Sequence, residues 1–154
     1  MKYLGVLVTT LLGLVSASAI PEPQPIEQRD VQTVHLTFYA GPTSYTLTIP
    51  ADGTTYPTNH NNLNINIIGS FDYDIYRLCK FNYDPPASGT VTLVSSIAGN
   101  ENQIFVGPPV PIKSVSCQGT CLYTYADCYR NGQFLGLCCN GYCAANKCRP
   151  WSYS

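Results

Sequence analysis

The sequence contains little charge and few of the groups that commonly act in catalysis. Only eight basic and nine acidic residues occur among 154, without any run of Lys or Arg, which argues against a partner made of nucleic acid or an anionic membrane. No G-x-S-x-G elbow, phosphate-binding glycine loop or C-x-x-C redox motif is present. We therefore expect neither a common hydrolase or oxidoreductase nor a bound cofactor.

Two histidines and one closely spaced pair of acids remain as candidates for proton transfer. His35 falls on the polar side of an expected strand and His60 in a polar loop, where an ordinary surface histidine is the simpler interpretation. Asp72 and Asp74 are predicted to project from one face of an extended strand. Paired carboxylates serve glycosidases and calcium sites, but solvated acids on a sheet are more common, so no catalytic or metal-binding residue is predicted.

The first 19 residues have the composition of a secretory signal. Lys2 precedes an apolar run shorter than the roughly 20 residues that cross a bilayer, and Ala17 and Ala19 supply the small residues of a cleavage site. We expect residues 1–19 to be removed and the protein to be secreted, extracellular and without a membrane anchor. Residues 20–30 alternate proline with polar side chains, which predicts a flexible arm or a pro-segment.

Residues 31–115 alternate apolar and polar side chains with a period of two, as strands with one buried face do. The pattern runs through "TVHLTFY", continues in "NNLNINIIG", where Leu63, Ile65 and Ile67 alternate with asparagines, and returns in "YRLCKFNY", "TVTLVSS" and "NQIFVG". About six such strands with turn residues between them predict a mainly β module, either an antiparallel β-sandwich or a small barrel. Three prolines in "VGPPVPI", residues 106–112, interrupt the pattern and predict a hinge between modules or a final edge.

The remaining segment, residues 116–154, holds seven of the eight cysteines. An even number in an exported chain implies disulfides, and eight cysteines permit 105 pairings. Zinc is not expected, because C-x2-C spacing and a nearby histidine are both absent. A piece of ~35 residues buries too little apolar area to stay folded, so each disulfide should supply ~2–4 kcal/mol. The expected disulfide residues are Cys79, Cys117, Cys121, Cys128, Cys138, Cys139, Cys143 and Cys148.

From Cys121 onward the spacing reads C-x6-C-x9-C-C-x3-C-x4-C, which resembles the inhibitor cystine knot, or knottin, over about residues 117–149. Cys79 and Cys117 are left over, and their pairing is expected to clamp the small module to the sheet. An alternative places Cys117 in the knot and pairs Cys121 with Cys79. The resemblance itself implies three bridges: Cys121–Cys139, Cys128–Cys143 and Cys138–Cys148.

The same knottin-like module is rich in tyrosine and also contains tryptophan and arginine, the residues that most often anchor protein interfaces. Its longest inter-cysteine loop, residues 129–137, offers a cation, a turn and apolar side chains on a rigid base, so that little ordering entropy is lost on binding. The predicted partner-binding residues are Arg130, Phe134, Tyr142, Arg149 and Trp151.

In size, signal sequence and cysteine content the chain resembles small secreted cysteine-rich proteins of filamentous fungi, including effectors and elicitors of plant pathogens. This resemblance implies a virulence-associated, non-enzymatic protein that binds a host or competitor protein, which can itself be a hydrolase, through a disulfide-stabilised surface. Two alternatives stay open. The first is an inhibitor of a protease or other hydrolase that inserts Arg130 into the active site. The second is a protein that binds cell-wall polysaccharide by stacking tyrosines and Trp151 on sugar rings.

Overall fold

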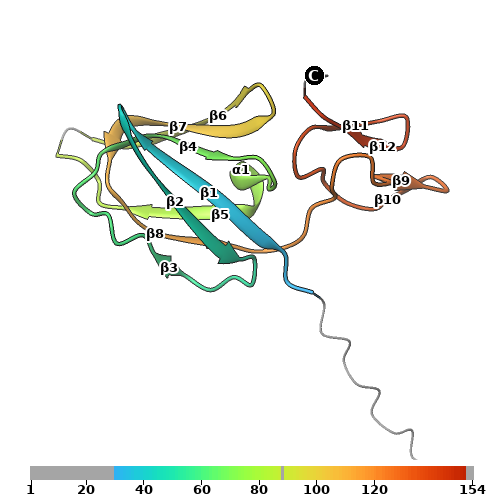
Figure 1. Ribbon diagram of the computed structural model, residues 1–154, viewed down its shortest axis with the longest axis horizontal. Helices are drawn as coiled ribbons and strands as arrows, with labels where there is room; N and C mark the ends of the chain where they lie inside the picture. The colour runs from blue at the N-terminus through green and yellow to red at the C-terminus, as the bar shows by residue number, and fades with distance from the viewer. Residues whose placement is uncertain (1–29, 88, 152–154) are drawn as a thin grey trace, which may run out of the picture.

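The computed structural model describes residues 30–87 and 89–151, which form two modules lying end to end (Figure 1). The expected signal sequence and all but the last residue of the expected arm lie outside the described residues. We call residues 30–119 the β module and residues 120–151 the cysteine module. Within the described ranges, no helix is long and apolar enough to cross a membrane.

Two antiparallel sheets build the β module. The five-stranded sheet has the order β2-β1-β4-β7-β6, and the three-stranded sheet has the order β3-β8-β5. The fold class is therefore as predicted: mainly β, with antiparallel sheets and a disulfide-rich C-terminal region. The elements of this module are β1 (Thr33–Ala40), β2 (Thr43–Pro50), β3 (Tyr56–Pro57), β4 (Ile65–Ser70), α1 (Ile75–Leu78), β5 (Cys79–Tyr83), β6 (Thr92–Ala98), β7 (Glu101–Val110) and β8 (Ile112–Cys117).

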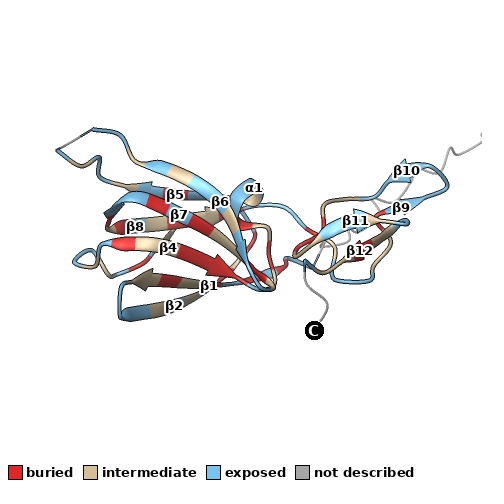
Figure 2. Ribbon diagram, turned by 90° about the horizontal axis from the view of Figure 1, so that it is seen from above, coloured by how far each residue is buried: buried red, intermediate tan, exposed pale blue. Residues whose placement is uncertain are grey.

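Apolar side chains from both sheets form one core. Figure 2 shows buried stretches in strands of the β module, among them β1, β4 and β7. Val34, Leu36 and Phe38 of β1 are buried and alternate with more exposed neighbours, as the period-two pattern predicts. Phe38 stacks on Tyr45 of β2 with ring centroids 4.7 Å apart, and it meets Phe81 of the other sheet edge-on at 6.4 Å. The two sheets thus form a sandwich sealed by aromatic and aliphatic side chains.

The prolines of residues 106–112 mark a change of sheet, so the expected hinge between modules or final edge is wrong. β7 is an interior strand of the five-stranded sheet, and the chain continues at once as β8 in the three-stranded sheet. Pro108 and Pro109 lie within a bulge of β7: the pairing passes from Ile65–Val110 to Ile67–Phe105, so residues 106–109 of β7 face the single residue Asn66 of β4. At a bulge, ladder hydrogen bonds are interrupted, so a residue without an N–H is tolerated there.

The alternation expected in "NNLNINIIG" is lost where β4 faces this bulge. Ile65 and Ile68 are fully buried, whereas Ile67 is only partly buried. The register with β7 shifts at this point of β4, and a simple period-two pattern cannot reveal such a shift.

The segment after β4 is not a strand, which corrects two expectations. The strand predicted across "YRLCKFNY" begins only at Cys79, because Asp74 caps the short helix α1 by accepting a hydrogen bond from the N–H of Arg77. Asp72 lies in the bend before this helix. Asp72 and Asp74 therefore do not share one face of a strand.

Four disulfides pair all eight cysteines, and the pairs are those that the sequence analysis proposed. Cys79 and Cys117 are directly opposite each other on β5 and β8. This bridge therefore joins two strands of the β module, and the expectation that it clamps the cysteine module to the sheet is wrong. β8 ends at Cys117, two residues past the module boundary expected at Val115. The remaining bridges are Cys121–Cys139, Cys128–Cys143 and Cys138–Cys148.

Candidate binding cleft between the modules

Two small hairpins form the frame of the cysteine module, β9 (Tyr129–Arg130) with β10 (Gln133–Phe134) and β11 (Tyr142–Ala144) with β12 (Lys147–Arg149). Their turns are short and use backbone conformations with positive φ, at 53° and 78° for Asn131-Gly132 and at 48° and 63° for Ala145-Asn146. Such pairs of left-handed residues match the twist of a two-residue hairpin. The sequence signal "NG" at Asn131 is therefore a true turn signal.

Gly141 allows the second hairpin to lie against the preceding chain. A Cβ atom at this position would lie 1.8 Å from a main-chain carbonyl oxygen of β12, and the residue has φ of 115°. Only glycine fits a position with both properties.

The Cys121–Cys139 disulfide anchors the cysteine module to the end of the β-sandwich. Both sulfur-bearing residues are buried and belong to the main apolar core. The buried side chain of Gln32 accepts a hydrogen bond from the Cys121 N–H at 3.0 Å and places its Nε2 3.2 Å from the sulfur of Cys139. The side-chain amide of Gln32, the residue directly before β1, thus contacts two residues of the cysteine module.

Two asparagines join the modules on the opposite side. Asn102 of β7 donates through Nδ2 to the carbonyl oxygens of Tyr73 and Cys139, and its Oδ1 accepts from the indole N–H of Trp151 at 3.1 Å. Asn140 donates across the same interface to main-chain carbonyls of the β module. Because these bonds are made by side chains of fixed shape to main-chain groups, the two modules have a defined mutual orientation.

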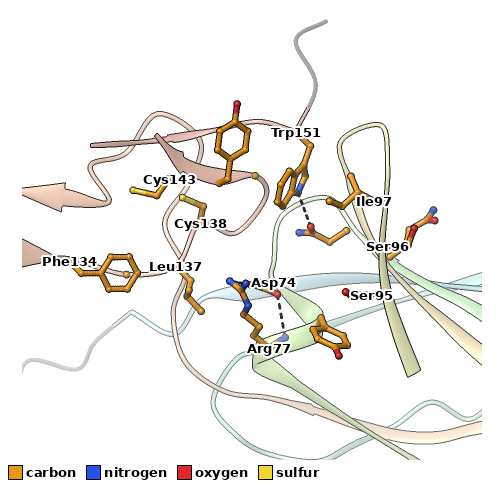
Figure 3. Close-up of a pocket in the computed structure, with 16 residues that line it drawn as sticks. Asp74, Arg77, Ser95, Ser96, Ile97, Phe134, Leu137, Cys138, Cys143 and Trp151 are labelled. Carbon is orange, nitrogen blue, oxygen red and sulfur yellow. Dashed lines mark hydrogen bonds and ion pairs between the residues drawn. The ribbon is translucent and has the colours of Figure 1, made fainter. Parts of the chain in front are cut away.

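A cleft of about 390 Å³ lies between the modules (Figure 3). One wall comes from α1, β6 and β7, and the other comes from the cysteine module. Tyr142 and Trp151 stand side by side with ring centroids 5.6 Å apart, and Trp151 is held by its bond to Asn102. The lining residues are Asp74, Tyr76, Arg77, Ser95, Ser96, Ile97, Asn102, Gln103, Phe134, Gly136, Leu137, Cys138, Gly141, Tyr142, Cys143 and Trp151.

Large, partly exposed aromatic and aliphatic side chains line the cleft. Tyr76, Ile97, Phe134, Tyr142 and Trp151 are each between 39% and 52% exposed although they are large and apolar. A contiguous group of such side chains rimmed by polar residues is typical of an interaction site.

The polar floor of the cleft contains one ion pair. Asp74 caps α1 and lies 3.5 Å from Arg77, whose side chain is largely exposed. Burial raises the pKa of the Asp74 carboxyl, while the hydrogen bond from the Arg77 N–H and the Arg77 charge act in the opposite direction. Asp74 is therefore engaged in holding the helix, and the charge of Arg77 stays largely exposed on this wall.

The structure brings together three of the five residues predicted to bind a partner. Phe134, Tyr142 and Trp151 line the cleft. Arg130 forms an ion pair within its own module at 3.0 Å, and the guanidinium of Arg149 lies over a tyrosine ring of its own module, 5.8 Å from the centroid. Neither arginine lines the cleft.

Sequence reasoning missed the contribution of the β module, above all Tyr76, Arg77 and Ile97. The first two fall in a stretch that was assigned to a strand, although it forms α1. A usable signal was present in β6, where Val94 and Ile97 are apolar but do not follow the alternation that buries one face.

The other candidates for chemistry lie outside the cleft. The Nδ1 atom of the exposed His35 is 2.5 Å from Oδ2 of Asp72, and the other carboxylate oxygen, Oδ1, accepts from the hydroxyl of Ser70 at 3.0 Å. His60 stacks on Tyr45 with ring centroids 4.0 Å apart. These side chains are occupied in contacts that tie the strands of the β module together.

One cluster has the geometry of a metal site. The sulfur atoms of Cys128, Cys138 and Cys148 lie within 4.8 Å of one another. All three sulfurs are in disulfides, however, and a disulfide lacks the thiolate that metals bind. The proximity reflects the crossing of two bridges in the small core of the module.

Comparison with models of protein families, with curated proteins and with solved structures finds no match for this chain. The chain is a small β-rich protein with four disulfides, several of them clustered near the C-terminus. Disulfides in this number indicate an oxidising, extracellular environment.

Proposed function

We propose that this protein is a secreted, non-enzymatic binding protein of the effector type, which holds a host or competitor protein in the cleft between its modules. One observation carries the proposal: large exposed side chains from both modules, including Phe134, Tyr142, Trp151 and Tyr76, line the same cleft. Aromatic residues in a preformed concave site are the usual anchors of protein recognition.

The rigid frame supports the same proposal. Trp151 is fixed by Asn102, and the hairpin that carries Phe134 is bounded by disulfides. Preorganised side chains lose little conformational entropy on binding, so more of the contact energy remains as affinity. The pairing of the last six cysteines, first with fourth, second with fifth and third with sixth, supports a knottin-like arrangement as the source of this rigidity.

The inhibitor alternative requires the loop that carries Arg130 to enter an active site, and this exposed side chain would then have to leave its ion pair with Asp127. The polysaccharide alternative depended on aromatic stacking, and Trp151 and Tyr142 are suitably placed for it. Binding to insoluble chitin and cellulose therefore belongs in the test of the cleft.

The test is affinity capture of extracellular proteins of candidate hosts and competitors on the oxidised protein. Trp151→Ala should weaken capture of a specific partner at least about tenfold, as expected for an interface anchor. Tyr123→Ala is the matched control, because Tyr123 is 63% exposed in the same module and does not line the cleft. A partner retained equally by both variants contradicts the proposed site, and retention on polysaccharide that is lost in Trp151→Ala selects the alternative.

A further inference from the structure

β6 is an edge strand without the usual protection against further pairing. Among residues 30–87 and 89–151, it pairs only with β7, and it ends the five-stranded sheet. Its sequence, TLVSSIA, contains no charge and no proline, and Val94 and Ile97 are 52% and 45% exposed. Natural proteins commonly protect exposed edges with lysine, proline or a bulge, and an edge that lacks them is a template for another strand.

The register determines which main-chain groups of β6 are free to pair. Ala98 and Glu101 face each other across a two-residue turn, so they exchange both hydrogen bonds of a closely spaced pair. Because bonded and non-bonded pairs alternate along an antiparallel ladder, the N–H and C=O groups of Leu93, Ser95 and Ile97 point away from β7.

The cleft runs along this free edge. Ser95, Ser96 and Ile97 are consecutive and all line it. Consecutive side chains of a strand point to opposite faces, so a cleft that all three line must border the edge of the strand and not one face alone. Figure 3 shows Ile97 beside Trp151, with Phe134 and Leu137 on the far side of the cleft.

We propose that the cleft takes an extended peptide segment of a partner protein, which adds to β6 as a sixth strand of the sheet. Main-chain bonds to Ser95 and Ile97 supply affinity, and alternate apolar side chains of the peptide lie against Ile97, Tyr142 and Trp151. This inference rests on the proposed function for the location of the partner and adds its form. An oligosaccharide can stack on the aromatic rings, but it offers no ladder of donors and acceptors to match a strand edge.

A proline at Ser95 tests the edge directly. The N–H of Ser95 points outward, so Ser95→Pro removes a donor that only an added strand uses and places a ring on the edge. Ser96→Pro is the matched comparison, because the Ser96 N–H pairs with β7 and its loss should lower the melting temperature. Ile97→Lys, at an exposed position, provides a second variant that blocks the edge through charge.

The probe is a displayed library of random dodecapeptides, selected on the oxidised wild-type protein, with the best peptide synthesised for titration. We expect wild-type binding to fall at least about tenfold in Ser95→Pro, in Ile97→Lys and with a peptide N-methylated at alternate residues. Circular dichroism should show an unchanged β-sheet signal in Ser95→Pro and Ile97→Lys.

Equal affinity of the peptide for wild type and both edge variants overturns the strand-addition inference. Failure to select any peptide, while Trp151→Ala still loses a captured partner, overturns it as well and leaves the proposed function standing. Sedimentation that shows a dimer abolished by Ser95→Pro overturns it in favour of a second copy of this chain as the occupant of the edge. If Trp151→Ala and both edge variants all capture the partner as well as the wild type does, the proposed function and the inference both fail.

Discussion

The β module and the cysteine module keep their folds by different means. The β module completely buries large side chains such as Phe38, Tyr73 and Ile112 between two sheets, and its single disulfide joins neighbouring strands. The cysteine module has a separate cluster of only three half-cystines with a partly buried Leu122, and its three bridges span 10 to 18 residues. Burial of apolar area stabilises the first module, whereas reduced entropy of the unfolded chain stabilises the second.

This difference matters for the cleft, because each module supplies one wall. The wall formed by α1, β6 and β7 persists under any condition that preserves the sandwich core. The wall that carries Phe134, Tyr142 and Trp151 depends on covalent bonds that a reductant can break. A change that affects one module should therefore remove half of the site and leave the other half folded.

The largest expected effect is on the sandwich core. Phe38→Ala deletes a fully buried ring that contacts Tyr45 and Phe81, so it should lower the free energy of unfolding of the β module by about 3–5 kcal/mol. Urea titration followed by far-ultraviolet circular dichroism measures this change. Phe71→Ala is the control: its ring is 62% exposed, and a shift within about 0.5 kcal/mol is expected. Similar shifts for the two variants would show that the apolar core is not what stabilises this module.

The second effect is on the cysteine module. Replacing Cys138 and Cys148 together by alanine should cost about 2–4 kcal/mol, which is more than a cluster centred on Leu122 can compensate. In a 1H–15N correlation spectrum, the signals of residues 121–151 should collapse while those of β1–β8 remain dispersed, and binding in the cleft should be lost.

Removal of the Cys79–Cys117 bridge provides the opposite case. This bridge lies within a sheet that has its own apolar core, so replacing both residues by alanine should leave the signals of the cysteine module unchanged. Collapse of the whole spectrum in the Cys138 and Cys148 variant would instead mean that the modules fold as one cooperative unit.

The sequence predicts the β module well where strands are regular and poorly where they are not. Alternation locates β1 and its buried residues, because each inward position needs an apolar side chain. The bulge in β7 and the helix α1 escape prediction for local reasons. A bulge adds a residue without a sequence signature of its own, and a helix of four residues is too short to display a period of 3.6.

The sequence predicts one of the two walls of the candidate cleft. Exposed aromatics of the cysteine module stand out in the sequence, since a small disulfide-rich piece has little interior in which to bury them. The opposite wall did not stand out, because Tyr76, Arg77 and Ile97 become neighbours of Trp151 only through the docking made by Asn102 and Asn140. Contacts between residues this far apart in the chain depend on tertiary structure, which local patterns do not encode.

The smallest expected effect is that acid changes the stability of the two modules in opposite directions. Hydrogen bonds from Lys147 and Arg130 hold the pKa of Asp127 below its usual value, so the stability that Asp127 contributes is present above the ordinary pKa and is lost as pH falls through the folded-state value. Burial raises the pKa of Asp74 at α1, so its contribution is present below the ordinary pKa and is lost as pH rises through the folded-state value. Acid should therefore loosen the cysteine module, whereas in the β module it should relieve the cost of burying the Asp74 charge.

Amide hydrogen exchange at Lys147 and at Leu78, whose N–H donates to the main-chain carbonyl of Asp74, tests this opposition when measured between about pH 2 and pH 6 after correction for intrinsic rates. Protection of Lys147 should decline on acidification, and protection of Leu78 should increase. Asp127→Asn should flatten the first profile alone. Asp74→Asn should flatten the second alone, because asparagine keeps the cap of α1 but cannot titrate. Parallel profiles at the two sites would mean that a common global opening, and not the local environment of each carboxylate, controls exchange in both modules.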